Sequence, residues 1–191
     1  MFLEPADEFG QAQGGFLAPP SGAGGRSLEI HDVAPGRYWV RMQSMHGYVA
    51  SMRSGSTNLL REPLVVSPGG ASIPIDVVMR DDTGEIAGRI EELVAAPVAL
   101  TRGMPRAIVY CVPTPDSTGQ LAEAGVTSDG TFSSPPLAPG EYRVLAFDRE
   151  HTGLEYRNPE AMKAYESKGP VVQVAAGQTE QVTLQLSSTP E

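Results

Sequence analysis

Residues 137–144 read LAPGEYRV, and residues 33–40 read VAPGRYWV. In each copy a Pro-Gly pair stands two residues before a Tyr, after which apolar and polar side chains alternate. Pro presets φ at one turn position and Gly accepts a positive φ at the next. Alternation with a period of two is typical of a half-buried antiparallel strand. The stretch therefore predicts a turn that leads into a strand, twice in one chain.

The similarity continues on both sides of this stretch. Residues 25–28 run parallel to residues 129–132, and VVSPGG at 65–70 matches VQVAAG at 172–177. A segment in which apolar and polar residues alternate follows residues 65–70 in the first copy and residues 172–177 in the second. Internal repetition of this kind indicates two copies of one domain of about 100 residues. Several short strands separated by Gly and Pro suggest that each domain is a β-sandwich.

The composition agrees with a folded, turn-rich chain. It has 191 residues, of which 21 are Gly and 17 are Pro, and 40% of the residues are hydrophobic. The formal net charge of −9 argues against nucleic-acid binding, which normally uses a basic face. No apolar run approaches the ~18 residues that a membrane span needs. A single cysteine, Cys111, excludes an internal disulfide framework.

The second copy, residues 81–191, is expected to be a complete domain. Its predicted strands cover residues 85–90, 107–112, 121–127, 131–134, 141–148, 171–175 and 181–187. One short helix is expected near 159–168, because Asn158 is a suitable N-cap and a Pro follows it at the first helical position. Met162 and Tyr165 are three residues apart, so we expect both to face the sheet.

The first copy, residues 1–80, is expected to lack its N-terminal strand or strands. If residues 2–5 align with 110–113, the chain begins inside the second strand and nothing corresponds to residues 84–107. A sandwich without an edge strand exposes unpaired backbone groups and part of its core. The chain is therefore expected to be either a piece of a longer protein or a protomer whose missing strand comes from a neighbour.

Several of these features together resemble a known family, the bacterial carboxypeptidase regulatory-like domains. They are Gly88 inside strand 85–90, DGTF at 129–132, LAPGEYRV at 137–144, and the closing segments 172–177 and 182–186. The resemblance covers the second copy and the latter two-thirds of the first. It implies an all-β fold class, with two tandem Ig-like or transthyretin-like antiparallel β-sandwich domains and the one short helix.

The same resemblance implies a biological setting. Members are secreted or cell-surface bacterial proteins in which this module is a non-catalytic spacer, accessory or adhesion domain, and peptidase activity is not implied. The expected location is extracellular or at the cell surface, with the periplasm as the alternative.

The residues themselves offer no catalytic motif, so we predict that the chain is not an enzyme. His31, His46 and His151 do not have the spacing of zinc ligands. Cys111 lies in the middle of a predicted strand with apolar residues on both faces. Such a position predicts a buried structural thiol, because reactive thiols need exposure and nearby positive charge.

One acidic group suggests a calcium site. Asp81, Asp82 and Glu85 lie at the junction between the two copies, where calcium can stiffen tandem domains through oxygen ligands. The group lacks the alternating spacing of an EF-hand loop. A hydrated acidic turn is the competing interpretation, and no other cofactor is expected.

Trp39 is the candidate contact residue for a ligand or partner. Alternation places Tyr38 in the core and Trp39 on the outer face, between Arg37 and Arg41. Its counterpart in the second copy is Arg143, so the fold does not require a Trp there. Trp and Arg are enriched where proteins bind each other, an exposed aromatic ring can stack on a sugar, and packing under a loop or a neighbouring domain is the third interpretation.

Three functions follow from these features. The first is a structural or adhesion module of a secreted or surface protein. The second is a subunit of an extracellular filament, in which self-association through the open edge of the first domain completes it by strand complementation. The third is a carbohydrate-binding accessory domain. The expected partners are therefore a protein or a carbohydrate, and neither nucleic acid nor a membrane span is expected.

Overall fold

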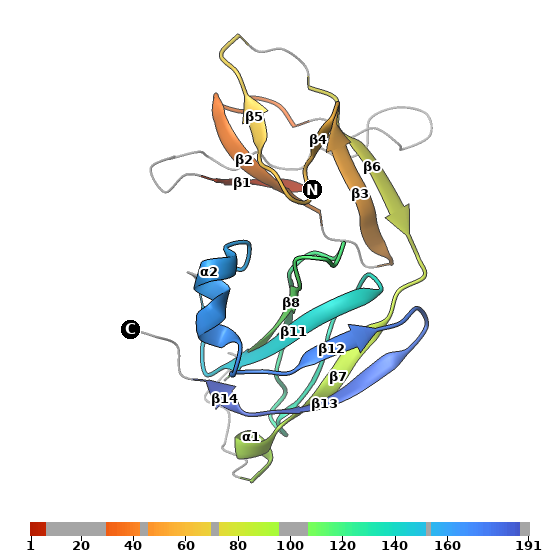
Figure 1. Ribbon diagram of the computed structural model, residues 1–191, viewed down its shortest axis with the longest axis vertical. Helices are drawn as coiled ribbons and strands as arrows, with labels where there is room; N and C mark the ends of the chain where they lie inside the picture. The colour runs from red at the N-terminus through yellow and green to blue at the C-terminus, as the bar shows by residue number, and fades with distance from the viewer. Residues whose placement is uncertain (7–29, 43–45, 70–72, 96–106, 152–153, 188–191) are drawn as a thin grey trace. The chain divides into compact units, whose positions relative to one another are not determined.

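The computed structural model describes residues 1–6, 30–42, 46–69, 73–95, 107–151 and 154–187 (Figure 1). The chain is all-β, as predicted, with short strands in several sheets and only short helices. The strands before residue 100 are β1 (Phe2–Pro5), β2 (Gly36–Arg41), β3 (Tyr48–Ser54), β4 (Thr57–Asn58), β5 (Leu64–Val66), β6 (Asp76–Arg80) and β7 (Glu85–Ile90). The later strands are β8 (Ile108–Pro113), β9 (Ala122–Gly125), β10 (Thr131–Ser133), β11 (Gly140–Phe147), β12 (Val171–Val174), β13 (Thr179–Leu184) and β14 (Leu186–Ser187). The helices are α1 (Glu91–Ala95), α2 (Pro159–Met162) and the 3₁₀ turn η1 (Lys163–Tyr165).

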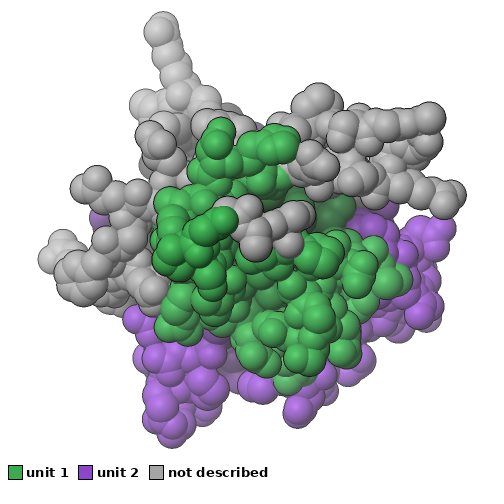
Figure 2. Space-filling model, turned by 90° about the horizontal axis from the view of Figure 1, so that it is seen from above, with its two compact units in different colours: residues 1–44, 51–78 green, residues 45–50, 79–191 purple. Residues whose placement is uncertain are grey.

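The chain forms two compact units, which Figure 2 shows in green and purple. Unit 1 comprises Met1–Ser44 and Ser51–Val78, and unit 2 comprises Met45–Ala50 and Met79–Glu191. The sequence places a domain boundary after residue 80, close to the end of unit 1. The short segment Met45–Ala50 groups with unit 2, although the sequence assigns it to the first copy.

Unit 1 contains a three-stranded antiparallel sheet of order β1-β2-β5. Leu3 lies opposite Val40, and Tyr38 lies opposite Leu64. All four side chains are buried, whereas the residues between them on each strand are half-buried or exposed. The alternation read from the sequence is therefore the alternation between an inner and an outer face of this sheet.

Unit 2 contains the same three strands in the same order, β12-β11-β8, extended by β9. The register is also the same. Tyr142 lies opposite Pro113 on the inner neighbour, as Tyr38 lies opposite Pro5. The sequence alignment of residues 2–5 with 110–113 is therefore correct residue by residue in the structure.

The two tyrosines also make the same hydrogen bond. The Tyr38 hydroxyl donates to the carbonyl oxygen of Ala34 at 2.7 Å, and the Tyr142 hydroxyl donates to that of Ala138 at 2.9 Å. Each bond spans four residues and closes the Pro-Gly turn onto the strand that follows it. The Pro-Gly-x-Tyr pattern is thus a local structural unit that the chain uses twice.

The glycine in this turn behaves differently in the two copies. Gly140 has a φ of 155°, the region that favours glycine. Gly36 has no positive φ. The prediction of a positive-φ glycine is therefore right for the second copy and wrong for the first.

The second sheet of unit 2 has the order β10-β7-β13, with β10 antiparallel and β13 parallel to β7. Strand β7 covers the predicted range 85–90. Its buried side chains, Ile86 and Ile90, belong to the main core of the unit. That core also contains the inner side chains of the other sheet: Val109, Cys111, Ala124, Tyr142, Val144, Ala146 and Val174.

The third sheet has the order β4-β3-β6. The sequence pattern predicts no strand at residues 48–58. In the structure β6 pairs with β3, whereas its counterpart in the repeat, β13, pairs with β7. The hairpin of β3 and β4, which follows β2 in the chain, therefore supplies the strand that pairs with β6.

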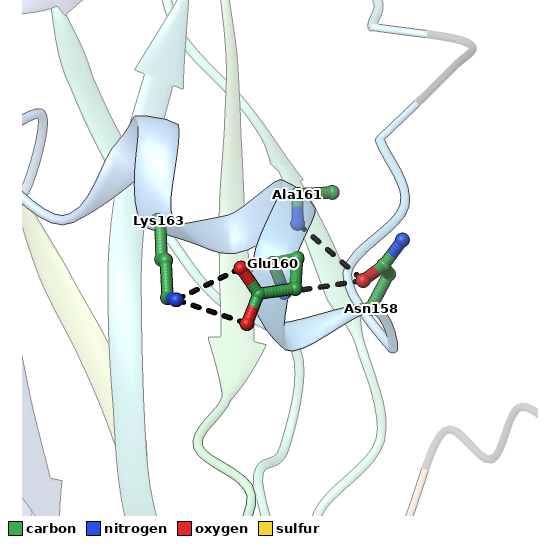
Figure 3. A network of polar contacts seen from close by, with 4 residues as sticks. All are labelled: Asn158, Glu160, Ala161 and Lys163. Atoms are coloured by element: carbon green, nitrogen blue, oxygen red, sulfur yellow. Dashed lines mark hydrogen bonds and ion pairs between the residues drawn. The ribbon is translucent and has the colours of Figure 1, made fainter.

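The predicted helix is present but shorter than expected. The side chain of Asn158 caps α2 by accepting hydrogen bonds from the backbone N–H groups of Glu160 at 3.1 Å and Ala161 at 3.4 Å (Figure 3). Lys163 forms an ion pair with Glu160 at 2.8 Å. The α-helix ends at Met162 and continues as the 3₁₀ turn to Tyr165, so the helical segment is shorter than the predicted range 159–168.

The segment with α2 and η1 covers the outer face of the β8–β11 pair in unit 2 (Figure 1). Leu145 and Phe147 are fully buried there, against Tyr165. Met162 packs against the same cluster. The expectation that Met162 and Tyr165 face the sheet is confirmed.

Gly88 offers a test of the sheet around β7. A Cβ atom added there would lie 2.1 Å from the carbonyl oxygen of Val182 on β13, and backbone cannot yield as a side chain can. We expect Gly88→Ala to lower the free energy of unfolding by about 2 kcal/mol, because overfilling a packed site typically costs 1–3 kcal/mol. Urea denaturation measures the change. Arg89→Ala, at the exposed neighbouring position, is the control, and equal losses in both variants would contradict the prediction.

Candidate functional site

Trp39, Arg37 and Arg41 lie together on one face of the sheet β1-β2-β5 in unit 1, as their alternation predicts. The strand register adds three residues from the neighbouring strands to the same face. We call this surface the outer face; it consists of Phe2, Glu4, Arg37, Trp39, Arg41 and Val65.

The centre of the outer face joins an aromatic ring to an ion pair. Glu4 on β1 lies directly opposite Trp39 on β2. Its carboxylate also reaches the neighbouring Arg41, with 2.7 Å between Glu4 Oε2 and Arg41 Nε. Trp39 itself is half-buried. This surface therefore combines an aromatic side chain with both signs of charge.

Two exposed apolar side chains extend this surface. Phe2, opposite Arg41, is 37% exposed, and Val65, opposite Arg37, is 60% exposed. Phe2, Glu4 and Val65 are members of the site that the alternation on the Trp39 strand alone does not predict. They could have been found from the alignment of residues 2–5 with 110–113. The antiparallel strand pairing that this alignment implies places these residues beside Trp39.

The corresponding face in unit 2 is closed by the chain itself. Tyr110 occupies the position of Phe2 and is 2% exposed under the segment with α2 and η1. Arg143, the counterpart of Trp39, donates hydrogen bonds from Nη1 to the carbonyl oxygens of Glu166 at 2.6 Å and Gly169 at 3.0 Å. The same position on the repeated sheet thus holds an internal cover in unit 2 and carries Trp39 in unit 1.

The acidic junction is organised around Asp82. Its carboxylate accepts hydrogen bonds from Nε and Nη2 of Arg80, at 2.8 and 2.6 Å, and from the hydroxyl of Tyr48 at 3.0 Å. The hydrogen bond from Arg80 is the main cause that holds the pKa of Asp82 below its ordinary value. Burial, together with the bond to Asp82, raises the pKa of Tyr48.

This arrangement does not favour the predicted calcium site. Both carboxylate oxygens of Asp82 already accept hydrogen bonds from Arg80. Within the described ranges, no three His, Cys, Asp or Glu side chains gather into a group that could hold a metal ion, so Asp81, Asp82 and Glu85 do not form one. Arg80, Asp82 and Tyr48 form a hydrogen-bonded network there instead.

The remaining reactive side chains are placed as structural groups. Cys111 is fully buried in the main core of unit 2, and burial raises the pKa of its thiol to about 12. His151 has its Nε2 atom 2.8 Å from the hydroxyl of Tyr165, and its ring packs edge-on against Phe147. This histidine fastens the loop after β11 onto the covered face. His31 and His46 lie at exposed positions.

Asp82 gives a pH-dependent prediction. Because its folded-state pKa lies below the ordinary value of 3.8, its ionised form stabilises the folded chain above that pH, and the contribution disappears as the pH falls through the folded-state pKa. We expect Asp82→Asn to be less stable than the wild type at pH 7 and equally stable in strong acid. Urea denaturation across this pH range measures the difference. Asp81→Asn is the control, and a difference that persists in acid would contradict the assignment.

Cys111 gives a prediction about chemical labelling. With the thiol pKa near 12, the thiolate fraction at pH 8 is about a thousandfold smaller than for an ordinary cysteine. We expect iodoacetamide to leave the folded chain unmodified and to alkylate Cys111 fully in urea, as mass spectrometry would show. Labelling at the same rate in both states would place the thiol at the surface.

The described helices α1 and α2 are too short and too polar to cross a membrane. The chain matches no protein-family model and no curated protein. What it does must therefore follow from its own residues and contacts.

Proposed function

We propose that this chain is a non-catalytic structural or adhesion module of a secreted or surface bacterial protein, and that it binds a protein partner through the outer face of unit 1. The observation that carries the proposal is the difference between two otherwise matching sheets. Tyr110 on the covered face is 2% exposed, whereas Phe2 at the same position is 37% exposed.

The residues of the outer face support a binding role over a packing role. In unit 2 the covered face buries the apolar side chains of Leu145 and Phe147, and its one arginine at this place, Arg143, is bonded to the covering segment. The outer face instead carries Trp39 together with Arg37 and Arg41. Trp and Arg are the residue types that most often dominate the energy of protein–protein contacts.

The family setting belongs to the same proposal. The paired Pro-Gly-x-Tyr turns and Gly88 support membership in the carboxypeptidase regulatory-like domains, and with it an extracellular or surface location. The non-catalytic role is supported by the buried, protonated state of Cys111 and by the use of His151 in packing.

Adhesion of the chain to bacterial surfaces tests the proposal. Beads that carry residues 1–191 are incubated with the cells from which the chain comes, and bead retention is measured. We expect Trp39→Ala to reduce the affinity by about thirtyfold, since loss of a central interface residue costs about 2 kcal/mol or more. Arg89→Ala, at an exposed position of unit 2, is the matched surface control and should bind as the wild type does.

Protease treatment and polysaccharide competition separate the alternatives. If the partner is a protein, mild proteolysis of the cells should abolish bead retention. Retention that survives proteolysis and is competed by soluble polysaccharide would favour the carbohydrate-binding function. Growth of ordered assemblies from the chain alone, seen by light scattering, would favour the filament subunit. Retention that Trp39→Ala leaves unchanged would refute the outer face as the contact surface.

A further inference from the structure

Strand β6 is an exposed edge of the sheet β4-β3-β6. Within the described ranges, β3 is its only strand neighbour. Val78 is 53% exposed and Met79 is 37% exposed, and the flanking Asp76 and Arg80 are exposed as well. An edge strand presents a row of backbone donors and acceptors to any strand that can align with it. Exposed apolar side chains make such an alignment more favourable.

The repeat itself does not require an edge strand with exposed apolar residues. In unit 2 the corresponding strand β13 is also an edge, but its exposed positions carry polar side chains: Thr179, Gln181 and Thr183. The exposed apolar residue Val78 is thus particular to β6. Polar side chains are the usual way in which an edge strand is kept from pairing, and β6 lacks them at its centre.

The charges of β6 are arranged for pairing with an identical strand. The strand reads DVVMR, with an acid at one end and a base at the other. If two copies pair antiparallel about Val78, Asp76 of each lies opposite Arg80 of the other, and Val78 lies opposite Val78. Opposite charges and apolar groups that face each other across strands are stabilising, and like charges are destabilising. In-register parallel pairing would oppose Asp76 to Asp76 and Arg80 to Arg80.

From this charge order we infer that two copies of the chain associate by antiparallel pairing of their β6 strands. Each copy contributes the same strand, so the contact has a two-fold axis and closes at a dimer. This inference concerns a different surface from the outer face and does not depend on the partner proposed there.

The contacts of Arg80 inside its own chain are compatible with the pairing. Arg80 uses Nε and Nη2 to reach Asp82, and its side chain is still 58% exposed. A guanidinium has five N–H donors, so the Nη1 group keeps both of its donors for a second carboxylate. Asp82 lies two residues further along and restrains the guanidinium near the end of the strand.

The expected dimer is weak. A strand of five residues buries less surface than the roughly 1,200 Å² of a typical stable interface, so we expect a dissociation constant above about 10 µM. Sedimentation velocity of the chain from about 5 µM to about 1 mM covers this range. A monomer–dimer equilibrium is the expected result.

Variants of β6 test the geometry. Val78→Lys places two positive charges face to face on the two-fold axis, and we expect it to raise the dissociation constant at least about tenfold. Val171→Lys is the matched control, because Val171 is 47% exposed on the edge strand β12. Asp76→Arg alone and Arg80→Asp alone should each weaken the dimer, and the double exchange should restore it.

Circular dichroism and urea denaturation of each variant confirm that it is folded before its association is compared. A chain that stays monomeric up to about 1 mM overturns the inference. So does a dimer that Val78→Lys leaves intact, or one that Val171→Lys weakens equally. Assembly beyond the dimer would also overturn it, because antiparallel pairing of one strand per copy closes at two.

Discussion

The register between the Tyr strand and its inner neighbour is the constraint on which each sheet depends. Side chains alternate between faces with a period of two, so a slip of one residue would turn every inner side chain outward. Two features recur at the same end of the strand in both units. The tyrosine lies opposite a proline, and its hydroxyl holds the carbonyl group four residues upstream. The core and the candidate site are the two faces that result.

The sequence predicts this part of the fold well because the signals are local. The Pro-Gly-x-Tyr pattern specifies turn, strand and inward residue within a few positions, and strand β7 was placed with its observed bounds. The cap of α2 was also predictable, since Asn158 and the Pro that follows it act on adjacent backbone groups. The length of the helix was not predictable, because the 3₁₀ turn ends where Tyr165 packs onto the sheet. That contact is tertiary.

The hairpin of β3 and β4 could not be predicted for a physical reason. In β3 the buried residues are Val49 and Met52, three apart, and the residues around them include small and polar side chains. That spacing carries no period of two, so the segment has the sequence of a loop and gains its strand structure from pairing. The full set of residues on the outer face could not be predicted either, because it also depends on strand pairing. Trp39 was found from its own strand, but Phe2, Glu4 and Val65 join it only through cross-strand pairs.

The opposite roles of neighbouring residues on β2 have an evolutionary consequence. Tyr38 and Val40 are confined to the interior, where any change of volume is felt by the whole unit. Arg37, Trp39 and Arg41 alternate with them and are free of that restriction. Neighbouring residues of this one short strand are therefore under different selective constraints. After the duplication that the repeat indicates, the outer positions could diversify at every second residue while the three-stranded sheet and its register were retained.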